Sequence, residues 1–406
     1  MGRLIFVNRY FLPDESATSL MLAQLIEALT KAGLTPTVLC SRVVASGRSD
    51  GVIAANEVVS GATVERLWST GFGGSSLFGK ALDYLTFLFA VAWRLLRKAR
   101  RGDVIVAKTD PPMLSTVCSF CASLRGATLV NWLQDVFPEV AQRMDVPLST
   151  GLFGAVLLRL RNRAARRAWM NVCIGERMAA HLRAEGIPQI TVIPNWAEPG
   201  IRPVPPSENS LRRAWGFGGR LVVGYSGNLG RAHEFETILD AAARVQALAG
   251  DRVAFLFIGG GHQRKRVAEL AAERGLENIH FRRFQPRERL AESLSVPDIH
   301  LVSLRPQLEG LIVPSKFYGI VSAGRPVFFV GAPDGELGAI IRDVGCGAVF
   351  SVGEGAELAA EVMSALDDPE KLRDWSDAAM RLARGPLDRA NSLDRWVSLL
   401  QSAVAG

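Results

Sequence analysis

The stretch that decides the fold is Leu221-Val222-Val223-Gly224-Tyr225-Ser226-Gly227-Asn228-Leu229-Gly230-Arg231. It begins with a short apolar run, which is typical of a strand buried on both faces of a parallel sheet. It ends with a turn that holds two glycines and a cation. Glycines let a phosphate approach the backbone, and the Arg231 guanidinium can bind phosphate oxygens. The alternative is a turn that only joins a strand to a helix, because glycine-rich turns are common at such junctions.

The same alternation of apolar runs and amphipathic segments extends through the whole chain. It predicts an α/β architecture of two doubly wound, Rossmann-like domains. The strands expected in the N-terminal half are Leu4–Val7, Thr37–Cys40, Val104–Ala107, Thr128–Leu133, Val172–Ile174 and Thr191–Ile193. Those expected in the C-terminal half are Leu221–Ser226, Ala254–Ile258, Ile279–Phe281, Ile299–Ser303, Val327–Val330 and Ala348–Phe350.

Prolines mark the boundary between the two halves. Five of them lie between Pro194 and Pro206, so we expect the interdomain linker there. The predicted domains are residues 1–198 and residues 199–390. A final amphipathic helix over residues 391–406 has Trp396 and Leu400 on its apolar side, and we expect it to pack back towards the first domain.

Composition narrows the class of protein. The chain has 406 residues, a net charge of +7, 48% hydrophobic and 21% charged residues, which excludes a disordered polyelectrolyte or a small disulfide-stapled module. Its five cysteines lie in apolar surroundings, which predicts reduced core residues and a cytoplasmic compartment. Cys118 and Cys121 form one Cys-x-x-Cys, but without further ligands it cannot close a zinc site, so we expect helix packing. The N-terminus lacks the features of a signal peptide.

All of the excess positive charge lies in the N-terminal half, where residues 1–200 hold 22 Lys and Arg against 15 Asp and Glu. Two segments there combine apolar and basic side chains: Leu77–Val91, which runs into Arg94–Arg101, and Gly151–Met170. Leu77–Val91 is too short and too charged to span a bilayer. One interpretation is a pair of core-facing helices with a solvated basic face. We favour peripheral contact with an anionic membrane surface, where each basic group contributes about 1 kcal/mol.

Further candidate site residues follow other strands of the C-terminal half. Ligands of doubly wound sheets bind at the carboxyl ends of the strands, and two such sheets are expected to face each other across a cleft. The turn Gly259-Gly260-Gly261 suits a flat base or a ribose. The segment Leu308-Glu309-Gly310-Leu311-Ile312-Val313-Pro314-Ser315-Lys316-Phe317-Tyr318 places a carboxylate, a hydroxyl and an ammonium at a helix start. Because a helix N-terminus attracts anions, we expect Lys316 to neutralise a diphosphate and Glu309 to accept hydrogen bonds from sugar hydroxyls.

These motifs resemble those of the retaining glycosyltransferases of family four, which have the GT-B fold. The resemblance covers nearly the whole chain. Within the family, the chain is most similar to the branch that builds bacterial O-antigen, capsule and exopolysaccharide repeat units. The segments that carry it are Tyr10–Glu15, Asp135–Glu139, Tyr225–Gly230, Glu309-Gly310, Pro314–Tyr318 and Ser322–Val327.

The resemblance implies a hexosyl or N-acetylhexosaminyl transferase (EC 2.4) that uses a nucleotide-diphosphate sugar, with UDP favoured. It implies a donor-binding C-terminal domain, an acceptor-binding N-terminal domain and front-face attack without a metal or other cofactor. Asp135 is expected to orient the acceptor or stabilise the oxocarbenium-like centre, or else only to cap its turn. The implied catalytic residues are Asp135, Glu309, Arg231 and Lys316. The implied donor-binding residues are Ser16, Thr18, Gly227, Asn228, Arg231, Gly260, Phe284, Gln285, Glu309, Gly310, Leu311 and Lys316.

The partners that the resemblance and the basic segments imply are a polyprenyl-diphosphate-linked glycan acceptor and an anionic membrane surface, with no nucleic acid. The expected location is cytoplasmic, peripheral at the inner face of the plasma membrane. Two other functions remain open. A sugar-nucleotide 2-epimerase uses the same fold without an acceptor, and a non-catalytic subunit only binds the nucleotide sugar.

Three positions depart from the family pattern. Phe317 stands where a ribose-binding Glu is usual, which leaves the ribose contact open and is the one hint of a non-catalytic subunit. No Lys follows Arg231 by about five positions, so Lys316 would carry more of the phosphate charge. Ser16-Ala17-Thr18 replaces the paired glycines of the first loop, at a helix start where amides and hydroxyls still suit a phosphate.

Overall fold

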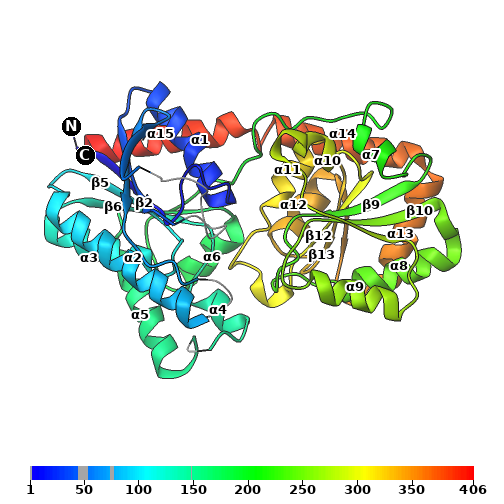
Figure 1. Ribbon diagram of the computed structural model, residues 1–406, viewed down its shortest axis with the longest axis horizontal. Helices are drawn as coiled ribbons and strands as arrows, with labels where there is room; N and C mark the ends of the chain where they lie inside the picture. The colour runs from blue at the N-terminus through cyan, green and yellow to red at the C-terminus, as the bar shows by residue number, and fades with distance from the viewer. Residues whose placement is uncertain (1, 44–53, 74–76, 148) are drawn as a thin grey trace. The chain divides into compact units, whose positions relative to one another are not determined.

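The computed structural model describes residues 2–43, 54–73, 77–147 and 149–406. They form two compact units (Figure 1), which we call unit 1, Met1–Pro194 with Ala390–Gly406, and unit 2, Asn195–Arg389. The first division falls close to the predicted boundary at residue 198. The chain returns to unit 1 for its last helix.

Unit 1 is built on an eight-stranded sheet in the order β3-β4-β2-β1-β5-β6-β7-β8. Its strands are β1 (Leu4–Val7), β2 (Pro36–Ser41), β3 (Asn56–Val59), β4 (Ala62–Leu67), β5 (Val104–Lys108), β6 (Thr128–Leu133), β7 (Met170–Cys173) and β8 (Ile190–Val192). Neighbours pair in parallel except β3 and β4, an antiparallel hairpin at one edge. The sequence analysis missed this hairpin because its residues alternate in burial instead of forming an apolar run.

Helices cover both faces of the unit 1 sheet (Figure 1). On one face, Phe87 and Val91 of α2 and Cys118 and Cys121 of α3 belong to one buried cluster with the strands. All five cysteines are buried and free, as expected. On the other face, the ring of Trp132 lies 4.7 Å from that of Trp396 in α15. The helices of unit 1 are α1 (Ala17–Lys31), α2 (Leu77–Lys98), α3 (Leu114–Arg125), α4 (Glu139–Arg143), α5 (Gly151–Arg167), α6 (Glu176–Ala184) and α15 (Arg389–Ala405).

Unit 2 holds a parallel six-stranded sheet in the order β11-β10-β9-β12-β13-β14. Every residue of β9 and β10 is buried, as their apolar runs predict. Its strands are β9 (Leu221–Ser226), β10 (Val253–Ile258), β11 (Ile279–Arg282), β12 (Ile299–Ser303), β13 (Val327–Val330) and β14 (Gly347–Phe350). Its helices are α7 (Ser210–Ala214), α8 (Glu236–Ala249), α9 (Arg264–Glu273), α10 (Leu290–Leu294), α11 (Lys316–Ser322), α12 (Glu336–Val344), α13 (Gly355–Asp367) and α14 (Pro369–Arg384), with short 3-10 turns η1 (Gly250–Arg252), η2 (Arg287–Arg289) and η3 (Pro306–Leu308).

Each sheet reverses its strand order at one point. In unit 2 the chain builds outward from β9 in one direction and then from β12 in the other, and in unit 1 the reversal falls between β1 and β5. At such a switch point the following connections diverge to opposite faces and leave a crevice at the carboxyl ends of the strands, where ligands of this fold bind. Both predicted doubly wound domains are therefore present. Their topology places the expected ligand sites at the residues after β9 and β12 and at those after β1 and β5.

Candidate active site

Two glycine turns meet beside the switch point of unit 2. The amide of Gly227, directly after β9, donates to the carbonyl of Ile258 at 2.9 Å, and the amide of Leu229 donates to the carbonyl of Gly260 at 2.7 Å. A Cβ on Gly259 would lie 2.1 Å from the carbonyl oxygen of Gly227, and one on Gly261 would lie 2.3 Å from Asn228 Oδ1. Gly259, Gly260 and Gly261 were predicted to form a turn that contacts a base or a ribose. In the structure they are also needed for the two turns to pack against each other.

The Phe284 ring lies against this double turn. Its edge is 3.2 Å from the position of a Cβ on Gly259 and 3.4 Å from one on Gly260, yet 61% of the residue is exposed. An aromatic ring held over a glycine turn offers a flat apolar surface to a base. The neighbouring Gln285 donates from its side-chain amide to the carbonyl of Arg283 at 3.0 Å.

Lys316, the first residue of α11, places its ammonium at the same end of β9. Nζ lies 3.5 Å from the ring centroid of Tyr225, and a Cβ on Gly227 would lie 3.6 Å from it. The nitrogen is buried and has no hydrogen-bond partner in the described part of the chain. Burial lowers the pKa of Lys316 well below its ordinary value. An unpaired ammonium out of water is costly, and an anion bound beside it would compensate that cost.

The imidazole of His233 lies next to this ammonium. Its Nδ1 lies 2.5 Å from the carbonyl oxygen of Ser303, the last residue of β12. Burial, together with the charge of Lys316, lowers the pKa of His233 to about 4. The ring is therefore neutral at physiological pH.

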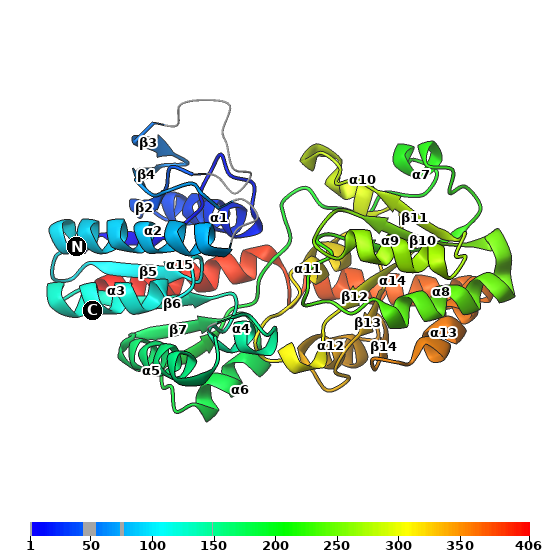
Figure 2. The same ribbon diagram turned by 60° about the horizontal axis from the view of Figure 1, so that its bottom comes forward.

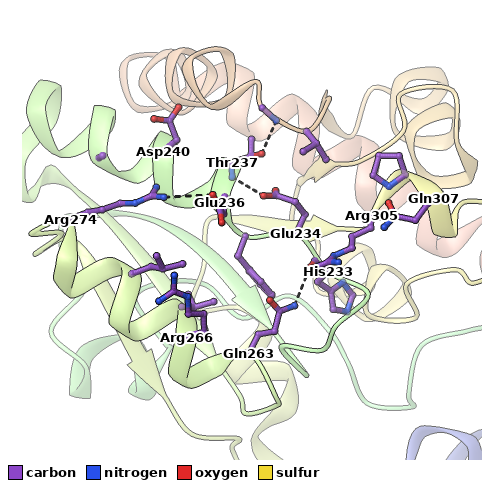
Figure 3. A pocket seen from close by; sticks show the side chains of 17 residues that line it. His233, Glu234, Glu236, Thr237, Asp240, Gln263, Arg266, Arg274, Arg305 and Gln307 are labelled. Atoms are coloured by element: carbon purple, nitrogen blue, oxygen red, sulfur yellow. Dashed lines mark hydrogen bonds and ion pairs between the residues drawn. The ribbon is translucent and has the colours of Figure 1, made fainter. Parts of the chain in front are cut away.

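His233 also lines a groove of about 920 Å³ that extends over α8 and α9 (Figure 3). Figure 3 shows Arg305 beside His233, whereas Arg266 and Arg274 lie further along the groove. Gln263 lines the same groove, and its Nε2 donates to the carbonyl of Gly230 at 2.7 Å. Arg231, one residue beyond, is exposed, and the described residues offer it no hydrogen bond or ion pair. Its guanidinium thus remains available to a ligand.

Glu309 has a structural partner in addition to its predicted role. Its Oε1 accepts a hydrogen bond from the backbone amide of Glu336 at 2.8 Å, at the N-terminus of α12. Gly310, at φ 73°, makes the left-handed turn that follows, and Leu311 is buried. The Glu309 carboxylate therefore also helps to position the start of α12. Phe317 is fully buried against Tyr318, so this position belongs to the core rather than to a ribose site.

A polar cluster occupies the switch point of unit 1. Lys108 ends β5 and is almost completely buried, with Nζ donating to the carbonyl of Thr18 at 3.1 Å and lying 3.6 Å from the ring centroid of Trp132. Burial lowers the pKa of Lys108 to about 7. Ser16 precedes α1, and its amide donates to Asp14 Oδ1 at 2.9 Å. The predicted Ser16 and Thr18 thus lie in unit 1, and the carbonyl of Thr18 contacts Lys108.

Two carboxyl groups follow neighbouring strands of this sheet. Lys108 pairs with Trp132 in the register of β5 and β6, which brings Asp110 and Asp135 to one edge. Burial and the charge of Asp110 raise the pKa of Asp135 and a hydrogen bond from Thr109 opposes the rise, which together bring it to about 6. Burial likewise raises the pKa of Asp110 to about 6. Asp135 was predicted and Asp110 was missed, although Thr109-Asp110-Pro111 after a strand was the available signal.

Glu139, the last residue of the Asp135–Glu139 motif, contacts side chains of two other helices. It contacts Arg161 of α5 and lies 3.4 Å from His181 Nε2 of α6. Arg161 also lines a small cavity of about 30 Å³ together with Asp135. A cavity of that size holds about one water molecule, so a sugar ring does not fit inside it.

An apolar surface covers three neighbouring helices of unit 1, α2, α3 and α5, which lie side by side in Figures 1 and 2. We call it the three-helix surface and define it by the exposed residues Phe78, Leu85, Phe89, Trp93, Phe120, Leu124, Leu152, Phe153, Val156 and Leu160. Phe89 is 72% and Trp93 57% exposed. The two segments are thus not simply core-facing helices with a basic outer face. No helix in the described ranges is long and apolar enough to cross a membrane.

Two Rossmann-like units, one of which buries a lysine nitrogen without a hydrogen-bond partner among the described residues, are the architecture of the GT-B class. Residues 18–196 match the family described as glycosyl transferase 4-like domain, and residues 207–381 match glycosyl transferases group 1. The chain belongs to this GT4-type family of GT-B glycosyltransferases, as the sequence motifs indicated.

Relatives agree with this membership. The probable glycosyltransferase WbjE of Pseudomonas aeruginosa is 31% identical over 272 residues, 66% of this chain and 67% of WbjE. The putative colanic acid biosynthesis glycosyl transferase WcaI of Escherichia coli (strain K12) is 27% identical over 287 residues, 68% of each chain. The crystal structure of Anabaena HepE in complex with UDP and glucose has a TM-score of 0.71 at 17% identity and covers 99% of this chain and 100% of HepE, which shows the shared fold.

Proposed function

We propose that this glycosyltransferase moves a sugar from a nucleotide-diphosphate sugar, with UDP favoured, to a lipid-linked glycan during cell-surface polysaccharide biosynthesis, with retention of anomeric configuration. The observation that carries the proposal is the buried ammonium of Lys316 beside Gly227 at the unit 2 switch point. A cation without an acceptor in that position calls for an anionic ligand. The name of WbjE supports sugar transfer, the name of WcaI supports polysaccharide biosynthesis, and the UDP bound to HepE supports the base.

The donor's diphosphate would bind at the turn after β9. Lys316 would supply one charge from α11, and the exposed Arg231 would supply a second from the turn itself. Phe284 offers its exposed ring to the base, beside Gly260. The carboxylate of Glu309, which accepts from the amide of Glu336, would also accept hydrogen bonds from sugar hydroxyls.

The reaction would depend on electrostatic stabilisation of the leaving group. As the bond from the anomeric carbon to the phosphate oxygen breaks, negative charge grows on the departing diphosphate, and preorganised cations stabilise it without reorganising. The acceptor hydroxyl attacks from the face that the diphosphate leaves and gives its proton to the diphosphate. Asp135 would orient the acceptor from its place after β6. This scheme assigns no step to a metal ion.

The three-helix surface would hold the enzyme at its acceptor. A polyprenyl-diphosphate-linked glycan stays in the membrane, so an enzyme that uses it benefits from a surface that inserts apolar side chains at the lipid interface. Exposed basic residues flank the surface, including Arg97 and Lys98 of α2 and Arg159 and Arg163 of α5. They suit anionic lipid headgroups on the cytoplasmic leaflet.

A thermal-shift screen with UDP-, GDP-, ADP- and TDP-sugars, with and without EDTA, tests the donor site. Binding at 100 times Kd adds about 2.7 kcal/mol to the free energy of unfolding, so we expect one base to raise the melting temperature, also with EDTA. Lys316→Met should remove the shift. Lys265→Met is the matched control, because Lys265 is 89% exposed on α9. The anomeric configuration of the product, read by NMR, tests retention; an inverted product contradicts it.

A non-catalytic nucleotide-sugar-binding subunit is the second candidate. Two observations favour it: Phe317 is buried where the family usually has a Glu, and Glu309 already binds the amide of Glu336. Tight binding of a nucleotide sugar, without transfer to lipid-linked acceptors and without slow hydrolysis, would select this function over the first.

A further inference from the structure

Two basic side chains contact the ring of Tyr225 at the end of β9. Lys316 Nζ lies 3.5 Å from the ring centroid, and the imidazole of His233 packs edge-on with its centroid 5.8 Å away. Gly227 lies beside the ammonium, because a Cβ there would be 3.6 Å from Nζ. The imidazole is therefore part of the same end of the sheet as the ammonium that we assign to the donor's diphosphate.

The backbone fixes which nitrogen of His233 is free. Nδ1 lies 2.5 Å from the carbonyl oxygen of Ser303, which is an acceptor only, so Nδ1 carries a hydrogen. Nε2 then holds the lone pair and is the atom that takes up a second proton. The position of the ring is held further by its own carbonyl, which accepts from Gln263 Nε2 at 3.2 Å.

Burial and the charge of Lys316 keep the His233 ring neutral in the free protein. Lys316 faces it from α11, Arg305 from the segment after β12, and Arg231 lies in its own loop. Glu234 is the neighbouring acid, but its Oε1 already accepts from the amide of Thr237 at 3.0 Å. Burial and Lys316 hold the pKa of His233 at about 4. A dianionic group beside Lys316 would reverse this balance, because an opposite charge favours the protonated ring.

We propose that His233, as an imidazolium, is a further cationic contact for the donor's diphosphate. The ring takes a proton from solvent when the nucleotide sugar binds, holds it while the diphosphate departs, and returns it when the nucleoside diphosphate leaves. Nε2–H then donates a charge-assisted hydrogen bond to a phosphate oxygen. This inference rests on the proposed donor function. The imidazolium also supplies a positive charge in place of the Lys that usually follows Arg231 in the family and is absent from this sequence.

Proton uptake on binding tests the proposal. UDP-, GDP-, ADP- and TDP-glucose serve as probes, because a diphosphate diester does not titrate between about pH 5.5 and 8.5, the range in which imidazoles titrate. Calorimetry in two buffers of different ionisation enthalpy counts the protons taken up. His233→Asn keeps an N–H for the Ser303 carbonyl but cannot be protonated. We expect the wild-type protein to take up more protons than this variant near pH 6, by up to about one, and the difference to vanish near pH 8.5.

A permanent charge provides the complementary test. His233→Lys should bind the probe at pH 8 at least as tightly as the wild type and should lose the pH dependence due to His233. His280→Asn is the matched control, because His280 lies on β11 against Phe217 and should keep the wild-type proton count. Equal proton uptake by the wild type and His233→Asn, with both variants folded by circular dichroism, would overturn this inference alone. If none of the four probes binds the wild type, the proposed donor function is wrong and this inference falls with it.

Discussion

Lys316 carries a charge that lies out of water without an acceptor in the described residues. Such a group destabilises the free protein and is kept where a ligand makes use of it. We predict that Lys316→Met raises the melting temperature of the free protein while lowering sugar transfer by at least about 100-fold, the effect of losing one preorganised charge. Differential scanning fluorimetry and a transfer assay measure the two effects. Transfer at the wild-type rate would remove Lys316 from the site.

Asp135 gives a second prediction, in which the size of the change in stability depends on pH. Because burial and Asp110 raise the pKa of Asp135 to about 6, the folded protein binds its proton more tightly than the unfolded chain does. The stability that this group contributes is therefore present at low pH and is lost as the pH rises through about 6. Asp135→Asn should stabilise the protein at pH 7.5, stabilise it less at pH 5, and lower transfer at both values.

Melting curves across this pH range check the Asp135 prediction. Asp251→Asn is the control, since the side chain of Asp251 is 87% exposed and should show no comparable effect. A destabilised Asp135→Asn protein at pH 7.5 would mean that the carboxylate is held by favourable contacts rather than desolvated. Asp110→Asn should behave in the same direction as Asp135→Asn, because burial raises the pKa of Asp110 to about 6 as well.

Individual site residues differ in how far the sequence predicted them. Asp135 follows the predicted strand Thr128–Leu133, and Lys316 begins a predicted helix. The places of both residues at the end of an element were therefore predictable. Asp110 was missed because its role depends on the register of β5 against β6, which brings it to the edge near Asp135. The hydrogen bond from the amide of Glu336 to Glu309 could not be predicted either, since it joins segments that only the tertiary fold brings together.

At the scale of elements, the apolar outer face of α2, α3 and α5 gives the third prediction. Replacing Phe89 and Trp93 by Ser should reduce binding to vesicles of anionic phospholipid, because these side chains are largely exposed and would enter the lipid interface. The same change should alter the free energy of unfolding by no more than about 0.5 kcal/mol per residue, as is usual for exposed positions. Sedimentation with vesicles measures the binding.

The matched control for the vesicle assay lies on the same unit. Val58, in β3, is 75% exposed and lies outside the three-helix surface, so Val58→Ser should leave vesicle binding unchanged. Replacing Arg97 and Lys98 by Gln should weaken binding to anionic vesicles and leave binding to neutral ones unchanged. Equal sedimentation of all variants would contradict a membrane role for this surface.

The last helix gives the fourth prediction. Trp396 of α15 is fully buried against Trp132, so Trp396→Ala should lower the free energy of unfolding by about 3–5 kcal/mol, the usual cost of removing a buried aromatic side chain. Chemical denaturation measures the loss. Trp93→Ala, at an exposed position, is the control and should change stability little. A small effect at Trp396 would mean that α15 adds little to unit 1.

Elements of uniform pattern were the ones that the sequence predicted well. The buried parallel strands read as apolar runs, and α15 was predicted from the spacing of Leu393, Trp396 and Leu400. The β3–β4 hairpin was missed, because a strand with one exposed side lacks such a run. The two sides of α2 could not be told apart either, since large apolar residues line both, and only the fold shows which side meets the sheet.

At the scale of the whole molecule, the alternation of strands and helices was enough to predict two Rossmann-like domains, whereas the GT-B fold was implied by the resemblance of the motifs. This worked because a parallel strand must be followed by a crossover, and the right-handed crossover leaves few arrangements open. The motifs added the glycosyltransferase family. The sugar and the acceptor stay undetermined by pattern, because selectivity among hydroxyl epimers depends on individual hydrogen bonds.

The return of the chain to unit 1 has a consequence for synthesis on the ribosome. Unit 2 is in effect an insertion: its residues, Asn195–Arg389, are translated between the two parts of unit 1. The sheet of unit 1 leaves the ribosome early, yet Trp132 stays without its covering ring until Trp396 is made. Unit 2 can therefore fold while its neighbour still exposes an apolar sheet face, and this face must be kept from other nascent chains until the final helix emerges.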